Sequence, residues 1–226
     1  MKLAAFFDMI CLLVAATSLE ISPFLEYYRS DNNQMPDNLH VDILITGIGL
    51  TASSYSITKQ IQIRRPDIII QAGIGGCFNK DIPLGSVVTI KQEAIGDQAV
   101  LEKGKLKTLF DLNLLPTNQF PFSKGWLINK SDVLKKVKLK KVKGITTNEI
   151  TTAKQRIKLY QDNFNPVVES LEGAALHYIG LMEKIQFLQI RSVSNYIGER
   201  NKRNWNMKDS IGNLNKELIR LLKTIN

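Results

Sequence analysis

The fold of this chain is decided by one stretch, residues 167–204, which reads VVESLEGAALHYIGLMEKIQFLQIRSVSNYIGERNKRN. Two valines open it as a short buried strand, and residues 187–193 form a second apolar strand that ends at Ser194 and Asn195. A strand–helix–strand unit of this length predicts two parallel strands joined by a crossover helix. The helix is indicated by apolar side chains at helical spacing, at Leu171, Ala175, Tyr178, Ile179 and Met182.

Two polar side chains follow the two predicted strands. Ligands of such sheets bind outside the carboxyl ends of the strands, where Glu172 and Asn195 both fall. We expect Glu172 to stay ionised in the first helical turn, and a carboxylate accepts hydrogen bonds from a vicinal diol such as that of a ribose. Taken alone, Glu172 is explained as well by a helix start, and Asn195 by a turn cap. The small residues 173–175 favour close approach of a ligand.

The order of these motifs resembles the purine nucleoside phosphorylase and nucleosidase superfamily. Residues 169–175, ESLEGAA, are similar to the Met-Glu-(Gly/Ala)-Ala-Ala helix start of its nucleosidases, and residues 191–195, RSVSN, to their Arg-Ala-Ile-Ser-Asp strand end. With Tyr196 and the run 199–205 (ERNKRNW) following, the chain most resembles the futalosine hydrolases, from about Leu12 to its end. The resemblance implies an α/β, three-layer phosphorylase/hydrolase-like fold with a central mixed β-sheet flanked by helices.

Length and composition fit one such domain. The chain has 226 residues, of which 44% are hydrophobic, and a formal net charge of +9. Much of the charge lies in residues 135–143, which we interpret as a solvated helix end and an edge strand in preference to a nucleic-acid patch. No run is long enough to span a membrane, and Cys11 and Cys77 fit small buried side chains in a reducing cytoplasm.

The N-terminus allows two interpretations. Residues 3–16 are apolar enough for a short signal peptide, but Asp8 interrupts them, and residues 10–16 also fit a buried first strand. We therefore predict an N-terminal extension at residues 1–8 and a single nucleosidase-like domain at residues 9–226, located in the cytoplasm.

Glu20 follows that first strand and opens a helix. Alone, it is explained as a first-turn helix acid. The resemblance implies that it activates the attacking water, as the glutamate in this place does in nucleosidases. Nothing after the first strand resembles the Gly- and Arg-containing phosphate loop of the phosphorylases, so hydrolysis is favoured over phosphorolysis.

A rival prediction comes from residues 47–52, GIGLTA, which fit the loose G-x-G-x-x-(G/A) dinucleotide pattern. A dinucleotide-binding fold has an acidic residue at the end of the next strand, where its side chain binds the ribose. That strand, residues 68–70, instead runs into Gln71, Ala72 and Gly73. Because the nucleosidases have a similar Gly-Ile-Gly strand end, the motif fits either interpretation.

The remaining predicted contacts rest on the resemblance. It implies that Gly73, Ile74, Gly75 and Leu171 line the nucleoside site, although the glycines also fit an ordinary tight turn. The aromatic residue that stacks on the purine in nucleosidases has no counterpart at residues 148–150, so Ile150 is a weak substitute. Residues 98–125 are irregular and apolar, which predicts a lid or a subunit contact in a homodimer or higher homo-oligomer.

The resemblance therefore implies an N-glycosyl hydrolase that cleaves a 6-oxopurine nucleoside, most closely futalosine, to hypoxanthine and dehypoxanthine futalosine in menaquinone biosynthesis. It further implies that Glu20 and Asn195 are catalytic, and we expect Glu172 to hold the ribose diol and Arg200 to reach a carboxylate on the 5′ substituent. No metal, organic cofactor, nucleic acid or membrane partner is expected. The alternatives are a 5′-methylthioadenosine/S-adenosylhomocysteine nucleosidase, a non-catalytic nucleotide-binding module and, more weakly, a nucleic-acid-binding protein.

Overall fold

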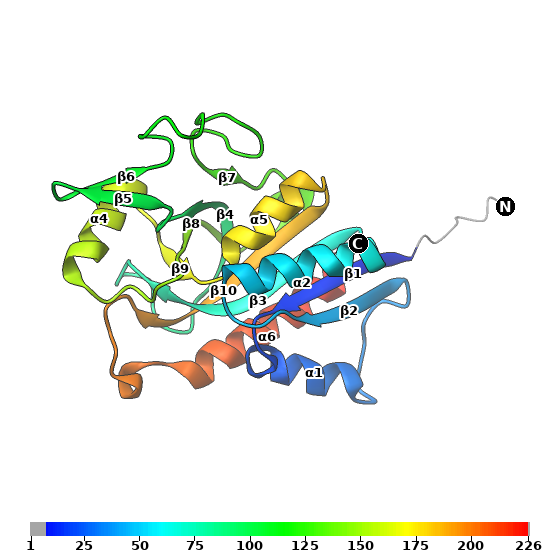
Figure 1. Ribbon diagram of the computed structural model, residues 1–226. Coiled ribbons are helices and arrows are strands. Elements are labelled where there is room, and N and C mark those ends of the chain that lie inside the picture. Colours follow the sequence, from blue (N-terminus) through cyan, green and yellow to red (C-terminus); the bar gives the residue numbers. More distant parts are fainter. Residues whose placement is uncertain (1–7, 226) are drawn as a thin grey trace.

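The computed structural model describes residues 8–225 (Figure 1). The strands are β1 (Met9–Ala15), β2 (Leu39–Ile45), β3 (Ile68–Cys77), β4 (Val87–Ile95), β5 (Ala99–Glu102), β6 (Lys105–Thr108), β7 (Leu127–Ile128), β8 (Lys140–Thr146), β9 (Val168–Ser170) and β10 (Gln186–Tyr196). The helices are α1 (Ser22–Arg29), α2 (Leu50–Ile63), α3 (Asp132–Lys136), α4 (Lys154–Phe164), α5 (Gly173–Met182) and α6 (Met207–Thr224), with short 3-10 turns η1 (Ser18–Ile21) and η2 (Lys202–Asn204).

A mixed sheet forms the middle layer. Its order is β10-β4-β8-β9-β3-β1-β2, and β7 adds to β4. Strand β3 also pairs with β10, so that β3, β10, β4, β8 and β9 close into a ring from which β1 and β2 extend. Strands β1, β2, β3 and β10 are parallel, while β4 is antiparallel to β10.

Successive side chains of β1 point to opposite faces of the sheet, and this explains the three layers. Cys11, Leu13 and Ala15 pack in the core beneath α1 and α6, whereas Leu12 and Val14 pack in a second core beneath α2 and α5. Because both faces are covered, the strand is apolar at every position. Figure 1 shows α2 and α5 on one face of the sheet and α1 and α6 on the other. The predicted three-layer fold with a mixed sheet is confirmed.

The predicted parallel crossover at residues 167–193 is wrong. The helix is present as α5, but β9 pairs antiparallel with the end of β3, whereas β10 runs parallel to β3 along its whole length. Strands β9 and β10 therefore run in opposite directions. Strand β9 lies between β3 and β8 in the ring. It runs parallel to β8, with Gly144 opposite Val168, and this pairing fixes its direction.

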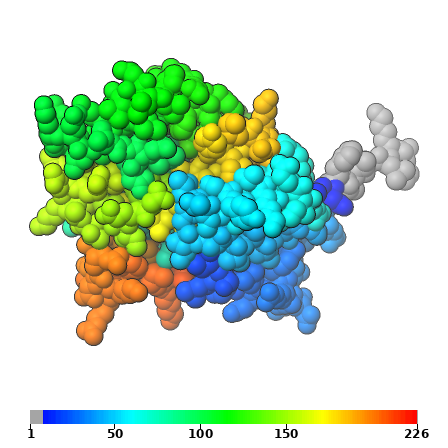
Figure 2. Space-filling view, viewed as in Figure 1, coloured from blue at the N-terminus to red at the C-terminus, as the bar shows by residue number. Residues whose placement is uncertain are grey.

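The expected glycine turn after residue 70 is also different, because β3 continues through its glycines to Cys77. Residues 98–125 begin as the hairpin β5–β6 and then continue irregularly to β7, and Figure 2 shows this green segment gathered at one end of the molecule. The basic run 135–143 is a helix end and an edge strand as predicted, because α3 ends at Lys136 and residues 140–143 of β8 pair only with β4; β8 gains β9 as a second partner from Gly144 onward.

The N-terminal prediction falls mostly outside the described part of the chain. Residues 1–7 of the expected extension lie outside the described residues, and β1 begins at Met9. Cys11 and Cys77 are buried and unbonded to one another, as predicted. Within residues 8–225, no helix combines the length and apolar character that crossing a bilayer requires.

Candidate active site

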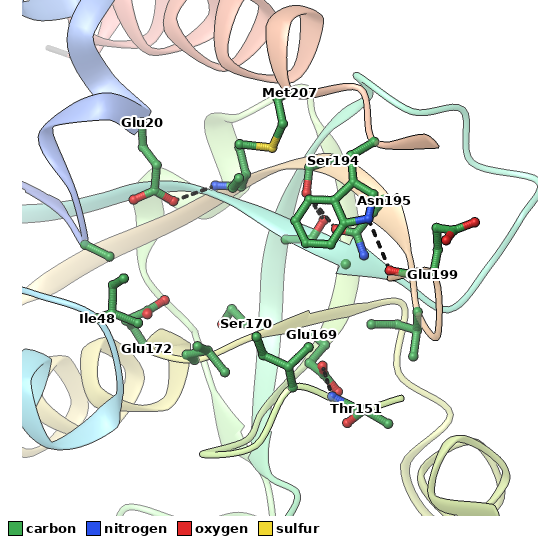
Figure 3. A pocket seen from close by; sticks show the side chains of 18 of the residues that line it. Glu20, Ile48, Thr151, Glu169, Ser170, Glu172, Ser194, Asn195, Glu199 and Met207 are labelled. Carbon is green, nitrogen blue, oxygen red and sulfur yellow. Dashed lines mark hydrogen bonds between the residues drawn. The ribbon is translucent and has the colours of Figure 1, made fainter. Parts of the chain in front are cut away.

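A cavity of about 310 Å³ opens where β3, β9 and β10 end and where η1 follows β1. Eight of the nine predicted site residues line it: Glu20, Ile74, Gly75, Ile150, Leu171, Glu172, Asn195 and Arg200. Figure 3 shows Glu20 and Glu172 toward one end of this cavity and Asn195, Glu169 and Glu199 toward the other. The fold thus brings together side chains from residue 20 to residue 200, which are far apart in the sequence.

Glu20 is held by hydrogen bonds to both of its carboxylate oxygens. Its Oε1 accepts from the backbone N–H of Ile74 at 3.0 Å, and its Oε2 accepts from the N–H and the hydroxyl of Thr17 at 3.1 and 3.2 Å. Burial raises the pKa of Glu20 above its ordinary value, while the nearby Arg191 guanidinium and the Ile74 bond oppose that rise. A carboxylate with a raised pKa is a stronger proton acceptor than an ordinary glutamate.

Glu172 is the residue that precedes α5, but its partners differ from those expected for a helix start. Its side chain makes no capping hydrogen bond to the helix. Instead, Oε1 accepts from the N–H of Gly49 at 3.0 Å, and Oε2 lies 3.6 Å from a guanidinium nitrogen of Arg191. Each oxygen keeps a free lone pair that a ligand hydroxyl can use.

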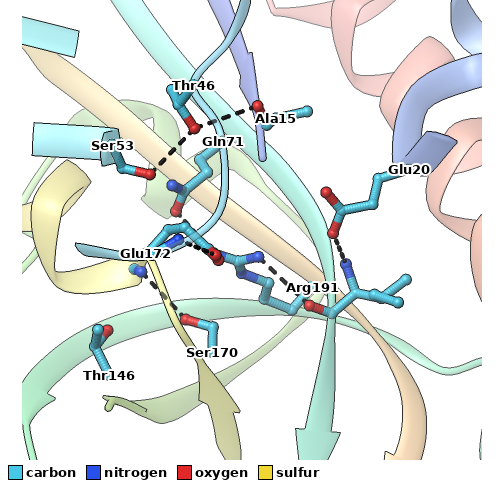
Figure 4. Close-up of polar contacts among 12 residues, drawn as sticks. Ala15, Glu20, Thr46, Ser53, Gln71, Thr146, Ser170, Glu172 and Arg191 are labelled. Carbon is cyan, nitrogen blue, oxygen red and sulfur yellow. Dashed lines mark hydrogen bonds and ion pairs between the residues drawn. The ribbon is translucent and has the colours of Figure 1, made fainter. Parts of the chain in front are cut away.

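Arg191 pairs with the carboxylate of Glu172 and lies near that of Glu20 (Figure 4). Its fully buried guanidinium donates to Gln71 Oε1 at 3.0 Å and to the carbonyl oxygen of Ile74 at 3.4 Å. A side chain at Gly73 would place its Cβ 2.3 Å from Arg191 Nη1 and 2.9 Å from Glu20 Oε1. Gly73 is not among the residues that line the cavity, although Ile74 and Gly75 beside it are. Its lack of a side chain leaves room for Arg191 beside Glu20.

Behind Arg191 lies a fully buried polar cluster that the sequence analysis missed. With the Gln189 amide turned so that both its ends are satisfied, its carbonyl accepts from Arg191 Nε at 3.2 Å. Its NH₂ then donates to Glu93 Oε2 at 3.1 Å and to His177 Nε2 at 2.9 Å. Burial raises the pKa of Glu93 to about 8 and lowers that of His177 to about 4. The cluster fixes the Arg191 side chain from behind.

Asn195 has a defined amide orientation. The Ser194 hydroxyl donates to Asn195 Oδ1 at 2.9 Å, and Asn195 Nδ2 donates to the carbonyl oxygen of Tyr196 at 3.2 Å. An amide has two acceptor positions on oxygen and two donor hydrogens on nitrogen. One acceptor position and one N–H of Asn195 are therefore left for a ligand.

The loop after β10 covers this end of the cavity. Glu199 accepts from the N–H of Asn201 at 2.7 Å and from Asn204 Nδ2 at 2.7 Å, and these bonds lower its pKa. The Trp205 indole N–H donates to the Glu199 carbonyl oxygen at 3.1 Å. Arg200 lines the cavity with an exposed side chain, whereas Arg203 is not among the lining residues.

Sequence reasoning missed part of the lining, including an aromatic side chain. Ile150 does line the cavity, but so does Trp205, which comes from the other side of the site. Glu169 was also missed, although an acid between a buried valine and a buried serine in β9 was a usable signal. Further lining residues are Thr17, Ile48, Thr151, Ser170, Ser194 and Met207.

The glycines of the rival dinucleotide motif have a different use. Gly47 and Gly49 have φ angles of 82° and 98°, a conformation that glycine adopts without strain, and they turn β2 into α2. The N–H of Gly49 points at Glu172. The protein's own carboxylate thus occupies the helix end that would otherwise hold a pyrophosphate.

Two buried carboxylates beside a buried arginine, set at the strand ends of this sheet, define an α/β protein suited to bind a polar, hydroxyl-bearing small molecule. The family model described as "Phosphorylase superfamily" matches residues 37–225, and the chain belongs to that superfamily.

Individual relatives are nucleosidases. The chain is 23% identical over 183 residues to a futalosine hydrolase of Thermus thermophilus, covering 79% of this chain and 80% of the relative. It is 24% identical over 163 residues to a 5′-methylthioadenosine/S-adenosylhomocysteine nucleosidase of Buchnera aphidicola, covering 69% and 66%. A crystal structure of the corresponding nucleosidase of Helicobacter pylori, in complex with a substituted pyrrolidin-3-ol, has a TM-score of 0.77 at 17% identity, and the match covers 96% of this chain and 98% of that chain. The prediction of an N-glycosyl hydrolase is confirmed by these relatives.

Proposed function

We propose that this chain hydrolyses the N-ribosidic bond of a 6-oxopurine nucleoside, with futalosine as the substrate and hypoxanthine and dehypoxanthine futalosine as the products. This reaction belongs to menaquinone biosynthesis. The observation that carries the proposal is the hydrogen-bonding state of Asn195. Its free N–H can donate to a 6-oxo group, and its free lone pair on Oδ1 can accept from a protonated N7. A 6-amino group would meet this N–H with another donor.

The other end of the cavity supplies the groups for hydrolysis. Glu20 takes a proton from a water molecule whose oxygen attacks C1′ of the ribose. The C1′–N9 bond breaks, its electron pair leaves with the base, and the base takes a proton from solvent at N7, while Glu20 later returns to solvent the proton that it took from the water. Positioned proton transfer of this kind contributes ~10²–10⁴ in rate. The two carboxylates also favour the positive charge that develops on the sugar as the bond opens.

Glu172 holds the ribose in this account. Gly49 and Arg191 occupy one position on each of its oxygens, and the remaining lone pairs accept from the 2′- and 3′-hydroxyls. Arg191 cannot serve as a free phosphate ligand, because it is already shared between Gln71, Ile74 and Glu172. Hydrolysis is therefore favoured over phosphorolysis.

The second candidate is cleavage of 5′-methylthioadenosine or S-adenosylhomocysteine, favoured by the relative from Buchnera aphidicola. The two candidates differ at the 6 position of the purine and at the 5′ substituent. Arg200 beside the cavity supports a 5′ group with a carboxylate, since guanidinium pairs well with carboxylate.

We further propose that the chain forms a homodimer or a higher homo-oligomer. Leu19, Ile48 and Ile150 line the cavity and yet are strongly exposed, which suits closure of the cavity by a second copy. Light scattering of the purified protein tests this, and a monomer at micromolar concentration would refute it. A cytoplasmic location stays a prediction.

Product analysis tests the proposed function. The protein is incubated with futalosine, inosine, 5′-methylthioadenosine and S-adenosylhomocysteine, each with and without phosphate, and the products are separated by chromatography. We expect hypoxanthine and the free sugar product from futalosine without phosphate. A requirement for phosphate would identify a phosphorylase, and tight binding without turnover would identify a binding module.

A further inference from the structure

A buried acid at the base end of the cavity has no role in the reaction described so far. Glu169 of β9 lines the cavity and is only 5% exposed. Figure 3 shows it on the Asn195 side of the cavity, beside Thr151 and away from Glu20.

Only one of its two carboxylate oxygens is used by the protein. Oε1 accepts from the backbone N–H of Thr151 at 3.1 Å. Oε2 is buried and has no hydrogen-bond partner among the described residues. Burial and the negative charges of Asp97 and Glu149 raise the pKa of Glu169, while hydrogen bonding by the side chain and backbone of Thr151 opposes that rise. An unsatisfied buried acceptor is costly, and a ligand N–H that reached it would remove that cost.

The purine edge offers such a donor at a predictable place. Around the six-membered ring of a 6-oxopurine, the 6-oxo group is followed by N1–H, a fixed donor. Asn195 has positions for N7 and the 6-oxo group, so the next atom along this edge faces the remaining wall of the base end. In a 6-aminopurine, N1 is an acceptor and would face the carboxylate with a lone pair.

We propose that Glu169 is a specificity-determining residue whose Oε2 accepts the N1–H of a 6-oxopurine base while Oε1 keeps the Thr151 loop in place. This inference rests on the proposed nucleosidase function and deepens it. Asn195 and Glu169 together then read three consecutive positions of the base: N7, the 6-oxo group and N1–H.

Glu169→Gln tests the assignment. The amide carbonyl can still accept from the Thr151 N–H, while its NH₂ replaces Oε2 and presents a donor to the base. We expect the ratio of kcat/KM for inosine over adenosine to fall roughly tenfold to a hundredfold, the range for one unmade buried hydrogen bond. Glu26→Gln is the matched control, because Glu26 is an exposed acid of α1 that neither lines the cavity nor acts on the charge of Glu169, and its ratio should equal that of wild type.

The outcomes separate this inference from the function on which it rests. If Glu169 only anchors the loop, the Gln variant loses activity on both nucleosides equally, and an unchanged ratio overturns the inference while the nucleosidase function stands. If wild type cleaves no nucleoside at all, the proposed function fails and the inference with it.

A second measurement needs no variant of Glu169 and applies if that variant does not fold. 1-Methylinosine keeps the 6-oxo group but has no N1–H. We expect wild type to cleave it at least tenfold less efficiently than inosine. Equal efficiency on the two nucleosides would show that N1–H is not recognised, and the inference would be discarded.

Discussion

Replacing the buried acid behind Arg191 should change how stability depends on pH. Glu93 is fully buried, and its pKa is raised from 4.5 to about 8 by burial. The native state therefore keeps a proton that the unfolded state has lost between these pH values. Because the native state binds more protons, stability is highest at low pH and falls as pH rises through this window, at roughly 1.4 kcal/mol per pH unit.

His177 opposes this trend at lower pH. Its pKa is lowered from 6.5 to about 4, so between these values the unfolded state binds the extra proton and stability rises with pH. Above pH 6.5, His177 is neutral in both states and no longer changes the free energy of unfolding with pH. Of these two residues, only Glu93 then makes stability depend on pH. Between pH 6.5 and 8 the Glu93 effect should amount to roughly 2 kcal/mol.

The assay is urea unfolding of wild type and Glu93→Gln at several pH values in that window. The neutral amide removes the titration and costs about 1 kcal/mol at all pH values, because one of its ends meets Thr146 or Gln189 less well. Wild type should lose its advantage over the variant as pH rises. Glu26→Gln on α1, an exposed acid, should follow wild type. Parallel curves for wild type and Glu93→Gln would refute a protonated Glu93.

Three further predictions concern the cavity itself. Glu20→Gln should lower kcat by ~10²–10⁴ while substrate still binds, and a variant with activity within a few fold of wild type would remove Glu20 from the mechanism. In wild type, kcat/KM should fall as pH decreases, with an apparent pKa above the ordinary glutamate value of 4.5. Glu172→Gln should weaken cleavage of a ribonucleoside far more than that of its 2′-deoxy analogue, and equal losses point to a structural role alone. Arg200→Ala should impair futalosine more than inosine, with Arg203→Ala as the control, and equal losses on both substrates exclude carboxylate binding.

The elements with a clear period were predictable from the sequence. Helix α5 (Gly173–Met182) lies where apolar side chains at helical spacing predict a helix, and β1 lies within one residue of its predicted bounds. The direction of β9 was not predictable, because it depends on pairing with β8 and β3 rather than on the helix that follows it. A strand–helix–strand unit predicts parallel strands only when both strands pair within one open parallel sheet, whereas β9 and β10 belong to a closed ring of mixed direction.

Site residues at the ends of strands were predictable from the sequence. Those whose position depends on tertiary packing were less predictable. Glu172 and Asn195 were found from their positions, and both line the cavity. The position of Gly73 outside the lining follows from Arg191, whose side chain fills the space above that glycine from another strand. Trp205 was missed because its place depends on how the loop after β10 folds back, through the bonds of Glu199.

The central claim is hydrolysis of a 6-oxopurine nucleoside, and the most direct test is a competition with wild-type protein in phosphate-free buffer. Futalosine and its 6-amino counterpart, aminofutalosine, differ only at the base and are offered together at equal concentration. From one unmade buried contact at Asn195, the account predicts that hypoxanthine is released roughly tenfold to a hundredfold faster than adenine. Faster release of adenine would contradict the account before any variant is made.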